Sequence, residues 1–164
     1  MPARPAVAAA VDAMRRILRE LRVAAGKTQM RAGISAAQLY VLEALSDGEE
    51  ASLSDIASRT LTDRSSVAAV VERLVESDLV SRQTATADRR RAAITITRSG
   101  RAVLRRAPRP PTALLIAGLE ALPDRDLEPL AEGLSALVEA MGLGDGPAGM
   151  LFEDTRPASR KRAV

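Results

Sequence analysis

The sequence predicts a mostly helical fold of the α+β class, in which several helices accompany one short two-stranded hairpin. Three observations predict it. Apolar residues recur every three or four positions along most of the 164 residues. A strand-like pattern replaces this period only at 79–84 and 92–97. The hydrophobic residues, 46% of the chain, are mostly Ala, Leu and Val, which suits closely packed helices better than a large β-sandwich.

The first predicted helix covers residues 6–25. Basic residues occupy the face opposite its apolar stripe, and Gly26 is the expected stop. The stripe consists of Val7, Val11, Met14, Leu18 and Leu21.

A second helix is expected to start at Ser35, a residue type that caps helix N-termini. A turn at 47–50 separates it from a short helix that Ser52 or Ser54 begins. The residues of these two helices that face inward are expected to be Leu39, Leu42, Leu45 and Ile56.

A longer helix is predicted from about 63 to 77, capped by Thr62 or Asp63. Strands follow at 79–84 and at 92–97, where four of six residues are β-branched. The polar segment 85–91 between them makes the tip of an antiparallel hairpin. The apolar stripe of the helix consists of Val67, Val70, Val71 and Leu74.

Thr97 is expected to cap a helix that Pro108, Pro110 and Pro111 interrupt, because proline lacks an amide donor. Helices are predicted to resume at 112–121 and 124–141. The domain organisation that follows is an N-terminal dimerisation helix (1–34), a winged helix-turn-helix (35–97), C-terminal dimerisation helices (98–143) and a disordered basic tail (144–164).

The arrangement at 35–97 points to duplex DNA as a partner. A short helix followed across a tight turn by a longer one lets the second helix lie in the major groove. The segment 82–109 adds nine Arg against Asp88 alone, which favours a polyanion. A solvated arginine-rich face is the alternative interpretation of this charge.

Candidate DNA contacts come from the longer helix and the hairpin. Small polar side chains on the helix can approach base edges, and tip guanidinium groups can enter the minor groove. First-turn residues such as Ser65 and Ser66 are alternatively ordinary helix residues, and Arg73 can alternatively pair with Glu76. The candidates are Thr62, Arg64, Ser65, Ser66, Ala69, Arg73, Arg82, Asp88, Arg89, Arg90 and Arg91.

The hairpin resembles that of the MarR (multiple-antibiotic-resistance regulator) family. The resemblance rests on Leu79-Val80 after the helix, on Asp88-Arg89-Arg90 at the tip and on Ile96-Thr97-Arg98-Ser99-Gly100 after the second strand. It is sharp over about 53–104. It implies a homodimer that binds a pseudo-palindrome, most often as a repressor, with Arg90 in the minor groove and Asp88 orienting the wing.

The chain departs from the family pattern in three places. Ala68 and Ala69 stand where the family often has Thr-Arg, so we expect specificity to depend more on the wing and on DNA shape. Asp78 replaces a frequent glycine, which predicts a strained helix end. The proline cluster at 108–111 falls within what is usually one long helix.

Homodimerisation is expected through the apolar stripes of the first and last helices, although packing within one chain is the alternative. The resemblance also implies a small lipophilic or phenolic effector near the junction with the DNA-binding module. Met14, Met30, Tyr40 and Leu114 are the candidate ligand-binding residues, with ordinary core packing as the alternative.

No catalysis is expected. The chain has no Cys and no His, which removes thiolate chemistry and the commonest metal ligand, and no catalytic motif appears. We expect no cofactor, no metal and no membrane partner, and a cytoplasmic location. The competing function is a winged-helix protein-interaction module that has lost DNA binding.

Overall fold

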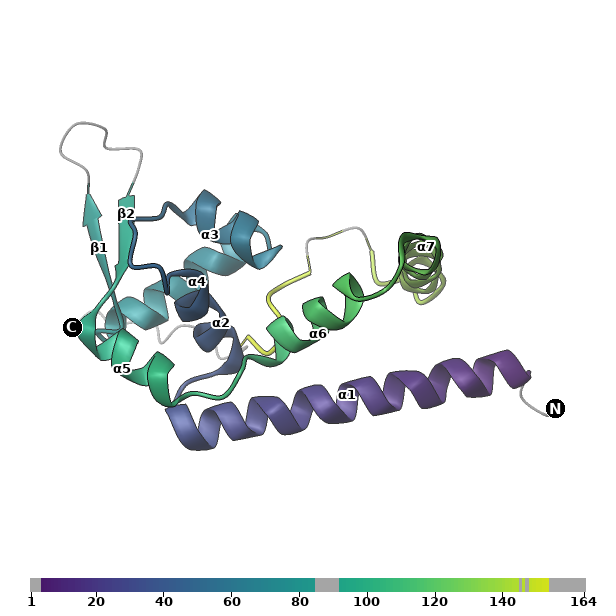
Figure 1. The fold of residues 1–164 in the computed structure, drawn as a ribbon. Helices are drawn as coiled ribbons and strands as arrows, with labels where there is room; N and C mark the ends of the chain where they lie inside the picture. The colour runs from purple at the N-terminus through teal and green to yellow at the C-terminus, as the bar shows by residue number, and fades with distance from the viewer. Residues whose placement is uncertain (1–3, 85–91, 145, 147, 154–164) are drawn as a thin grey trace, which may run out of the picture.

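The computed structural model describes residues 4–84, 92–144, 146 and 148–153. The described chain is mostly helical and carries one two-stranded antiparallel sheet, which confirms the predicted class. Figure 1 shows a body of short helices with the hairpin at one end and the long helix α1 along one side. The elements are α1 (Pro5–Ala32), α2 (Ala36–Ala44), α3 (Leu53–Thr60), α4 (Arg64–Glu76), β1 (Val80–Thr84), β2 (Ala92–Ile96), α5 (Arg98–Arg106), α6 (Pro111–Glu120) and α7 (Asp124–Ala140).

Helix α1 is longer than the sequence pattern indicated. It continues through Gly26 to Ala32, and the expected stop at Gly26 is wrong. A single glycine inside a helix costs only about 1 kcal/mol, which does not end it. The helix ends at Gly33, whose φ of 72° is left-handed and whose N–H donates to the Gln29 carbonyl oxygen at 3.0 Å.

The core lies where α2, α3 and α4 meet the sheet. The predicted inward-facing residues of these helices, including Leu39, Ile56 and Val67, are fully buried. Ile94 of β2 joins them and is also fully buried. The helices begin where the local sequence indicates, because Ser35, Ser52 and Asp63 each accept a backbone N–H at a helix N-terminus.

The hairpin pairs β1 with β2 in the register Val80↔Ile96 to Thr84↔Ala92. Strand β2 is joined to the loop before α3 by an isolated antiparallel bridge between Ile94 and Ala51. Each of these two residues donates its N–H to the other's carbonyl oxygen, at 3.0 and 2.9 Å. The loop before α3 therefore serves as a third, very short strand that fixes the hairpin.

The predicted proline break is confirmed. Helix α5 starts after Thr97, whose hydroxyl accepts the Gly100 N–H at 3.0 Å, and ends at Arg106. Helix α6 starts at Pro111, and α7 follows Pro123. The chain thus crosses from the hairpin to α7 in separate helical segments rather than in one long helix.

The segment after α7 differs from the predicted disordered tail. Gly142 and Gly144 both adopt left-handed backbone angles, and the chain turns back toward the body. Met150 is only 5% exposed and belongs to the same core cluster as Ile56 and Val67. A buried methionine has no local sequence signature, so the expectation was wrong for residues 148–153. Residues 154–164 lie outside the described part of the chain.

Asp78 adopts the strained conformation that the sequence predicts, with a φ of 55°. Its N–H donates to the Val75 carbonyl oxygen, and the Leu79 N–H donates to the Leu74 carbonyl oxygen at 2.9 Å. A side chain at this position costs energy that glycine avoids, because glycine tolerates positive φ.

We therefore expect Asp78→Gly to raise the free energy of unfolding by about 1 kcal/mol. Chemical denaturation measures the change. Asp78→Ala is the matched control and is expected to lower stability, because alanine keeps the Cβ and loses the polar side chain. Equal effects of the two substitutions would show that backbone strain at Asp78 is negligible.

Candidate nucleic-acid interface

The candidate interface is built on α4, which follows α3 across a turn at residues 61–63. Leu61 ends α3 in the left-handed conformation, with a φ of 51°. The Thr62 N–H donates to the Ala57 carbonyl oxygen at 3.0 Å, which closes the turn. This short, hydrogen-bonded connection fixes the angle between the two helices, as a helix-turn-helix requires.

A carboxylate organises the first turn of α4. Asp63 accepts the backbone N–H groups of Ser65 at 2.9 Å and of Ser66 at 3.0 Å. Both serine hydroxyls also donate to it. These hydrogen bonds, led by that from the Ser65 hydroxyl, hold the pKa of Asp63 well below its usual range. The helix therefore starts with a fixed negative charge.

The cap limits what the two serines offer to DNA. Their hydroxyl protons already point at Asp63, so each oxygen retains only acceptor capacity for a further partner. Ser65 is exposed, whereas Ser66 is half-buried. This geometry favours the alternative interpretation, in which Ser65 and Ser66 are ordinary residues at the start of a helix.

The other candidates on α4 differ in exposure. Arg64 is exposed, and Ala69 and Arg73 are half-buried. Thr62 is also half-buried, and its hydroxyl donates to the Thr60 carbonyl oxygen at 2.9 Å. The core-facing side of the helix holds Val67, Val70, Val71 and Leu74, so α4 presents its polar residues away from the body.

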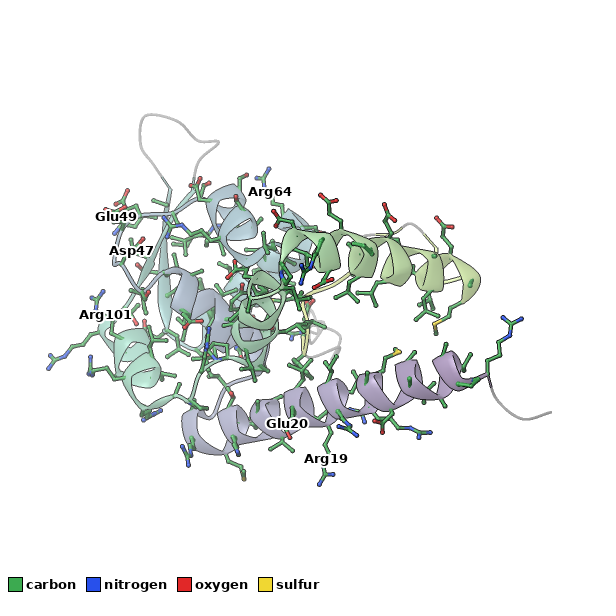
Figure 2. The ribbon with its side chains drawn as sticks, turned by 45° about the vertical axis from the view of Figure 1, so that its right-hand side comes forward. Arg19, Glu20, Asp47, Glu49, Arg64 and Arg101 are labelled. Atoms are coloured by element: carbon green, nitrogen blue, oxygen red, sulfur yellow. The ribbon has the colours of Figure 1, made fainter. Side chains whose placement is uncertain are left out.

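The hairpin and α4 are directed to the same side of the molecule. Figure 2 shows Arg64 pointing toward the side to which β1 and β2 extend, whereas Arg19 of α1 points to the opposite side. Arg82, on β1, is exposed. The wing candidates Asp88, Arg89, Arg90 and Arg91 lie outside the described residues.

Two contacts that were not predicted from the sequence hold α3 and the hairpin in place. Besides the Ala51–Ile94 bridge, Arg59 of α3 donates to the Ala44 carbonyl oxygen at 2.7 Å and to Asp47 at 2.9 Å. These bonds brace α3 against the end of α2. The hydrogen bonds of Arg59 could have been predicted from the acidic turn at 47–50, because this turn lies within fifteen residues of Arg59, the one arginine of α3.

A third constraint lies at the end of the wing. The Leu79 carbonyl oxygen accepts both the N–H and the hydroxyl of Thr97, each at 3.1 Å. A Cβ at Gly100 would lie 2.1 Å from the same oxygen. The Thr-x-x-Gly spacing after β2 therefore has a steric cause: helix α5 passes too close to the backbone of residue 79 for any side chain.

The four candidate ligand residues are not brought together. Leu114 lines an apolar cavity of about 430 Å³ between α1, α6 and α7, with neighbours that include Ile17, Leu21 and Leu130. Met30 is 80% exposed on α1, and Tyr40 is buried in the core. Burial, with nearby Glu43, raises the pKa of the Tyr40 hydroxyl.

No helix within the described residues is both long and apolar enough to cross a membrane. Those residues also contain no cluster of three or more acidic, His or Cys side chains suited to a metal ion.

The geometry defines a winged helix-turn-helix, the fold of a large class of transcription regulators. Solved structures share it. The chain is 18% identical to a MepR-like protein with pseudoligands bound (TM-score 0.58), covering 84% of this chain and 97% of that one. It is 25% identical to the transcriptional regulator BldR from Sulfolobus solfataricus (TM-score 0.52), covering 85% and 99%.

A further similar structure is that of BpsR from Bordetella bronchiseptica, whose DNA binding is regulated by 6-hydroxynicotinic acid. The two chains are 27% identical with a TM-score of 0.53, covering 81% of this chain and 98% of that one. Residues 32–91 match the model of the MarR family. No curated protein matches the chain in sequence. The matched residues cover the helix-turn-helix and the first strand of the hairpin, and the match agrees with the resemblance of the sequence to this family.

Proposed function

We propose that this protein is a transcription regulator that binds duplex DNA sequence-specifically as a homodimer. One observation carries the proposal: α4 exposes Arg64 on the same side of the molecule to which the hairpin extends, and the Ala51–Ile94 bridge fixes the hairpin there. In this arrangement α4 enters the major groove while the tip, with Arg90, reaches the neighbouring minor groove.

The dimer is supported by apolar surface that one chain leaves uncovered. Helix α7 has no buried residue, although it carries a stripe of large apolar side chains. The side chains of that stripe are each 38–60% exposed: Leu130, Leu134, Leu137, Val138 and Met141. Apolar residues of α1 are similarly exposed, including Val11, Met14 and Leu18.

A second copy of the chain covers these stripes in the proposed dimer. Each fully buried Leu or Val contributes about 1.5–3 kcal/mol, so pairing the stripes yields ample association energy. A two-fold interface also places two α4 helices for a pseudo-palindromic operator. Repression follows in the simplest case, because the bound dimer occupies the DNA.

We further propose release by a small lipophilic ligand. The cavity of about 430 Å³ between α1, α6 and α7 has the size of a small-molecule site, and its lining is mostly aliphatic. It adjoins α1 and α7, which would set the distance between the two α4 helices in the proposed dimer. A small uncharged phenol is a suitable first probe for such a lining, read out as a change in DNA affinity.

The competing function, a protein-interaction module without DNA binding, is favoured by the charge of α4. Its N-cap residue is the ionised Asp63, and Glu72 and Glu76 are exposed near its C-terminal end. These carboxylates repel phosphates. Binding to DNA therefore requires the arginines beside α4 and on the hairpin to outweigh them.

Arg64→Ala and Arg82→Ala are each expected to weaken binding to a random-sequence duplex. The slope of log affinity against log salt concentration is negative, and each phosphate that is no longer neutralised reduces its magnitude by about one. Fluorescence anisotropy over a salt series measures the slope. Arg19→Ala is the matched control, because Arg19 lies on the opposite side of the molecule. If all three variants kept the wild-type slope, α4 and the hairpin would not face the DNA.

A further inference from the structure

Helix α5 and the short segment after it carry five arginines that the proposed interface does not use. Residues 98–109 contain these arginines and no Asp or Glu, and all five side chains are exposed. Within the part of the chain that the structure describes, the ion pairs involve Arg16, Arg59 and Arg125 instead. The five are Arg98, Arg101, Arg105, Arg106 and Arg109.

Three of these arginines lie on one face of α5 and are called here the α5 arginine stripe. Arg98, Arg101 and Arg105 are three and four residues apart, so their side chains are neighbours on the helix surface. The opposite face holds Gly100 and Val103, which are buried. Seven residues of helix rise by about 10 Å. Duplex DNA of that length carries about three phosphates on each strand, so the stripe matches a phosphate backbone in charge and in spacing.

An acidic turn lies beside the stripe without neutralising it. A Cβ at Gly48 would lie 3.9 Å from Nη1 of Arg101, so the turn at 47–50 approaches this guanidinium. The Asp47 carboxylate of the turn already pairs with Arg59 at 2.9 Å. The two glutamates of the turn are exposed, and neither forms an ion pair within the described residues. The stripe therefore keeps its charge for a polyanion.

The stripe lies at the end of the molecule that is remote from the proposed dimer interface. Figure 1 shows α5 at the base of the hairpin, at one end, and α7 with the N-terminal end of α1 at the other. A dimer formed through α1 and α7 therefore carries one stripe at each of its outer ends. The duplex that passes each hairpin leaves the protein at the same two ends.

A straight duplex on α4 and the hairpin would pass the stripe at a distance. Helix α5 begins at the base of the hairpin, and its five-residue strands span about 17 Å. Exposed charges are largely screened beyond about 8 Å at physiological salt. Phosphates reach the stripe only where the duplex beyond the hairpin bends toward the protein.

We propose that the α5 arginine stripe binds backbone phosphates of the duplex that flanks the operator, and so bends the DNA around the outer ends of the dimer. The planar guanidinium fork matches phosphate oxygens in a bidentate way. The stripe directly follows the hairpin, where Arg82 is also exposed, and this continuity favours DNA over an acidic protein surface. The contact reads no base edges, and sequence affects it only through the cost of bending. The proposal rests on the proposed DNA-binding function.

Energy transfer between dyes at the two ends of a random-sequence duplex measures the bend. A duplex of about 40 base pairs extends well beyond two half-sites whose centres are about 10 base pairs apart. At one dimer per duplex, the wild-type protein is expected to raise the transfer efficiency above that of free DNA. R98Q/R101Q/R105Q is expected to leave the efficiency at the value of free DNA.

Anisotropy with the same duplex over a salt series gives a second readout. R98Q/R101Q/R105Q is expected to bind at least about tenfold more weakly at low salt, because the stripe no longer releases counterions. The magnitude of its salt slope is expected to fall by about 0.9 for each phosphate that the stripe neutralises in the wild type.

Two further variants separate the stripe from net charge. R98K/R101K/R105K keeps all three charges and is expected to keep the bend and the salt slope. R15Q/R19Q/R22Q is the matched control, because it removes three exposed arginines from one face of α1, where Arg19 points away from the DNA side. It is expected to keep the bend. Melting curves check that each variant is folded.

The outcomes distinguish this proposal from the proposed function. If R98Q/R101Q/R105Q bound and bent the duplex as the wild type does, the flanking contact would be refuted, the regulator would survive, and an acidic protein surface would be the partner to test next. Equal loss of bending in R15Q/R19Q/R22Q would assign the effect to net charge and would also overturn the proposal. Absence of salt-dependent binding by the wild type would refute the proposed function itself.

Discussion

Leu134→Glu in α7 is expected to separate the proposed homodimer into monomers. Leu134 lies in the middle of the exposed apolar stripe of α7, and a two-fold interface places two copies of each substitution at the contact. Loss of two buried leucines alone costs about 3–6 kcal/mol. The dimer dissociation constant should therefore rise by at least about a hundredfold, since each 1.4 kcal/mol is a factor of ten.

Sedimentation velocity at several protein concentrations measures this change. Ala136→Glu is the matched control, because Ala136 is exposed on the opposite face of the same helix. The control should remain dimeric. Operator affinity should fall with the dimer, since one monomer engages one half-site. A Leu134→Glu protein of wild-type mass and affinity would place the interface elsewhere.

Gly100→Ala is expected to destabilise the fold more than alanine at the other helical glycines, Gly26, Gly118 and Gly133, where an added Cβ meets no atom within 4 Å. The added Cβ would lie 2.1 Å from the Leu79 carbonyl oxygen and 2.8 Å from a side-chain carbon of Ile96. The first neighbour is backbone, held by two hydrogen bonds from Thr97. Relief requires α5 or the base of the hairpin to move, at a cost of about 3 kcal/mol or more.

Thermal and urea denaturation test this expectation. Gly26→Ala is the control: Gly26 is exposed within α1, and a Cβ there meets no atom within 4 Å. Alanine at that position should stabilise the protein by about 0.5–1 kcal/mol. If Gly100→Ala were as stable as the wild type, the close approach of α5 to residue 79 would be absent in solution.

The elements predicted well are those whose signals are local. Ser35, Ser52 and Thr97 cap helices because a hydroxyl accepts an N–H three residues ahead, which sequence spacing reveals. The left-handed Asp78 was predictable for the same reason, since the helix end and its missing glycine are adjacent.

The features missed depend on contacts between distant residues. Gly26 and Gly33 look equally able to end a helix, and only the path of the following chain selects Gly33. The Ala51–Ile94 bridge joins residues more than forty positions apart, and both are unremarkable in type. Met150 is one apolar residue in a Gly- and Pro-rich tail, and it is buried by core residues that lie more than forty positions earlier in the chain.

The candidate interface was predicted in part. The exposed Arg64 and Arg82 and the rigid hairpin agree with the pattern that pointed to DNA. The engagement of both serine hydroxyls by Asp63 was not predictable, because a cap by Thr62 and a cap by Asp63 look alike in sequence. The structure thus shifts the expected contacts from α4 serines toward arginines.

Selection of bound sequences from a random duplex pool examines DNA recognition and dimer geometry together. A dimer that presents two α4 helices and two wings should enrich a site with two inverted half-sites, their centres one helical turn apart. We predict recovery of that symmetric site. Recovery of no enriched sequence, or of a single unrepeated half-site, would contradict the proposed dimeric regulator.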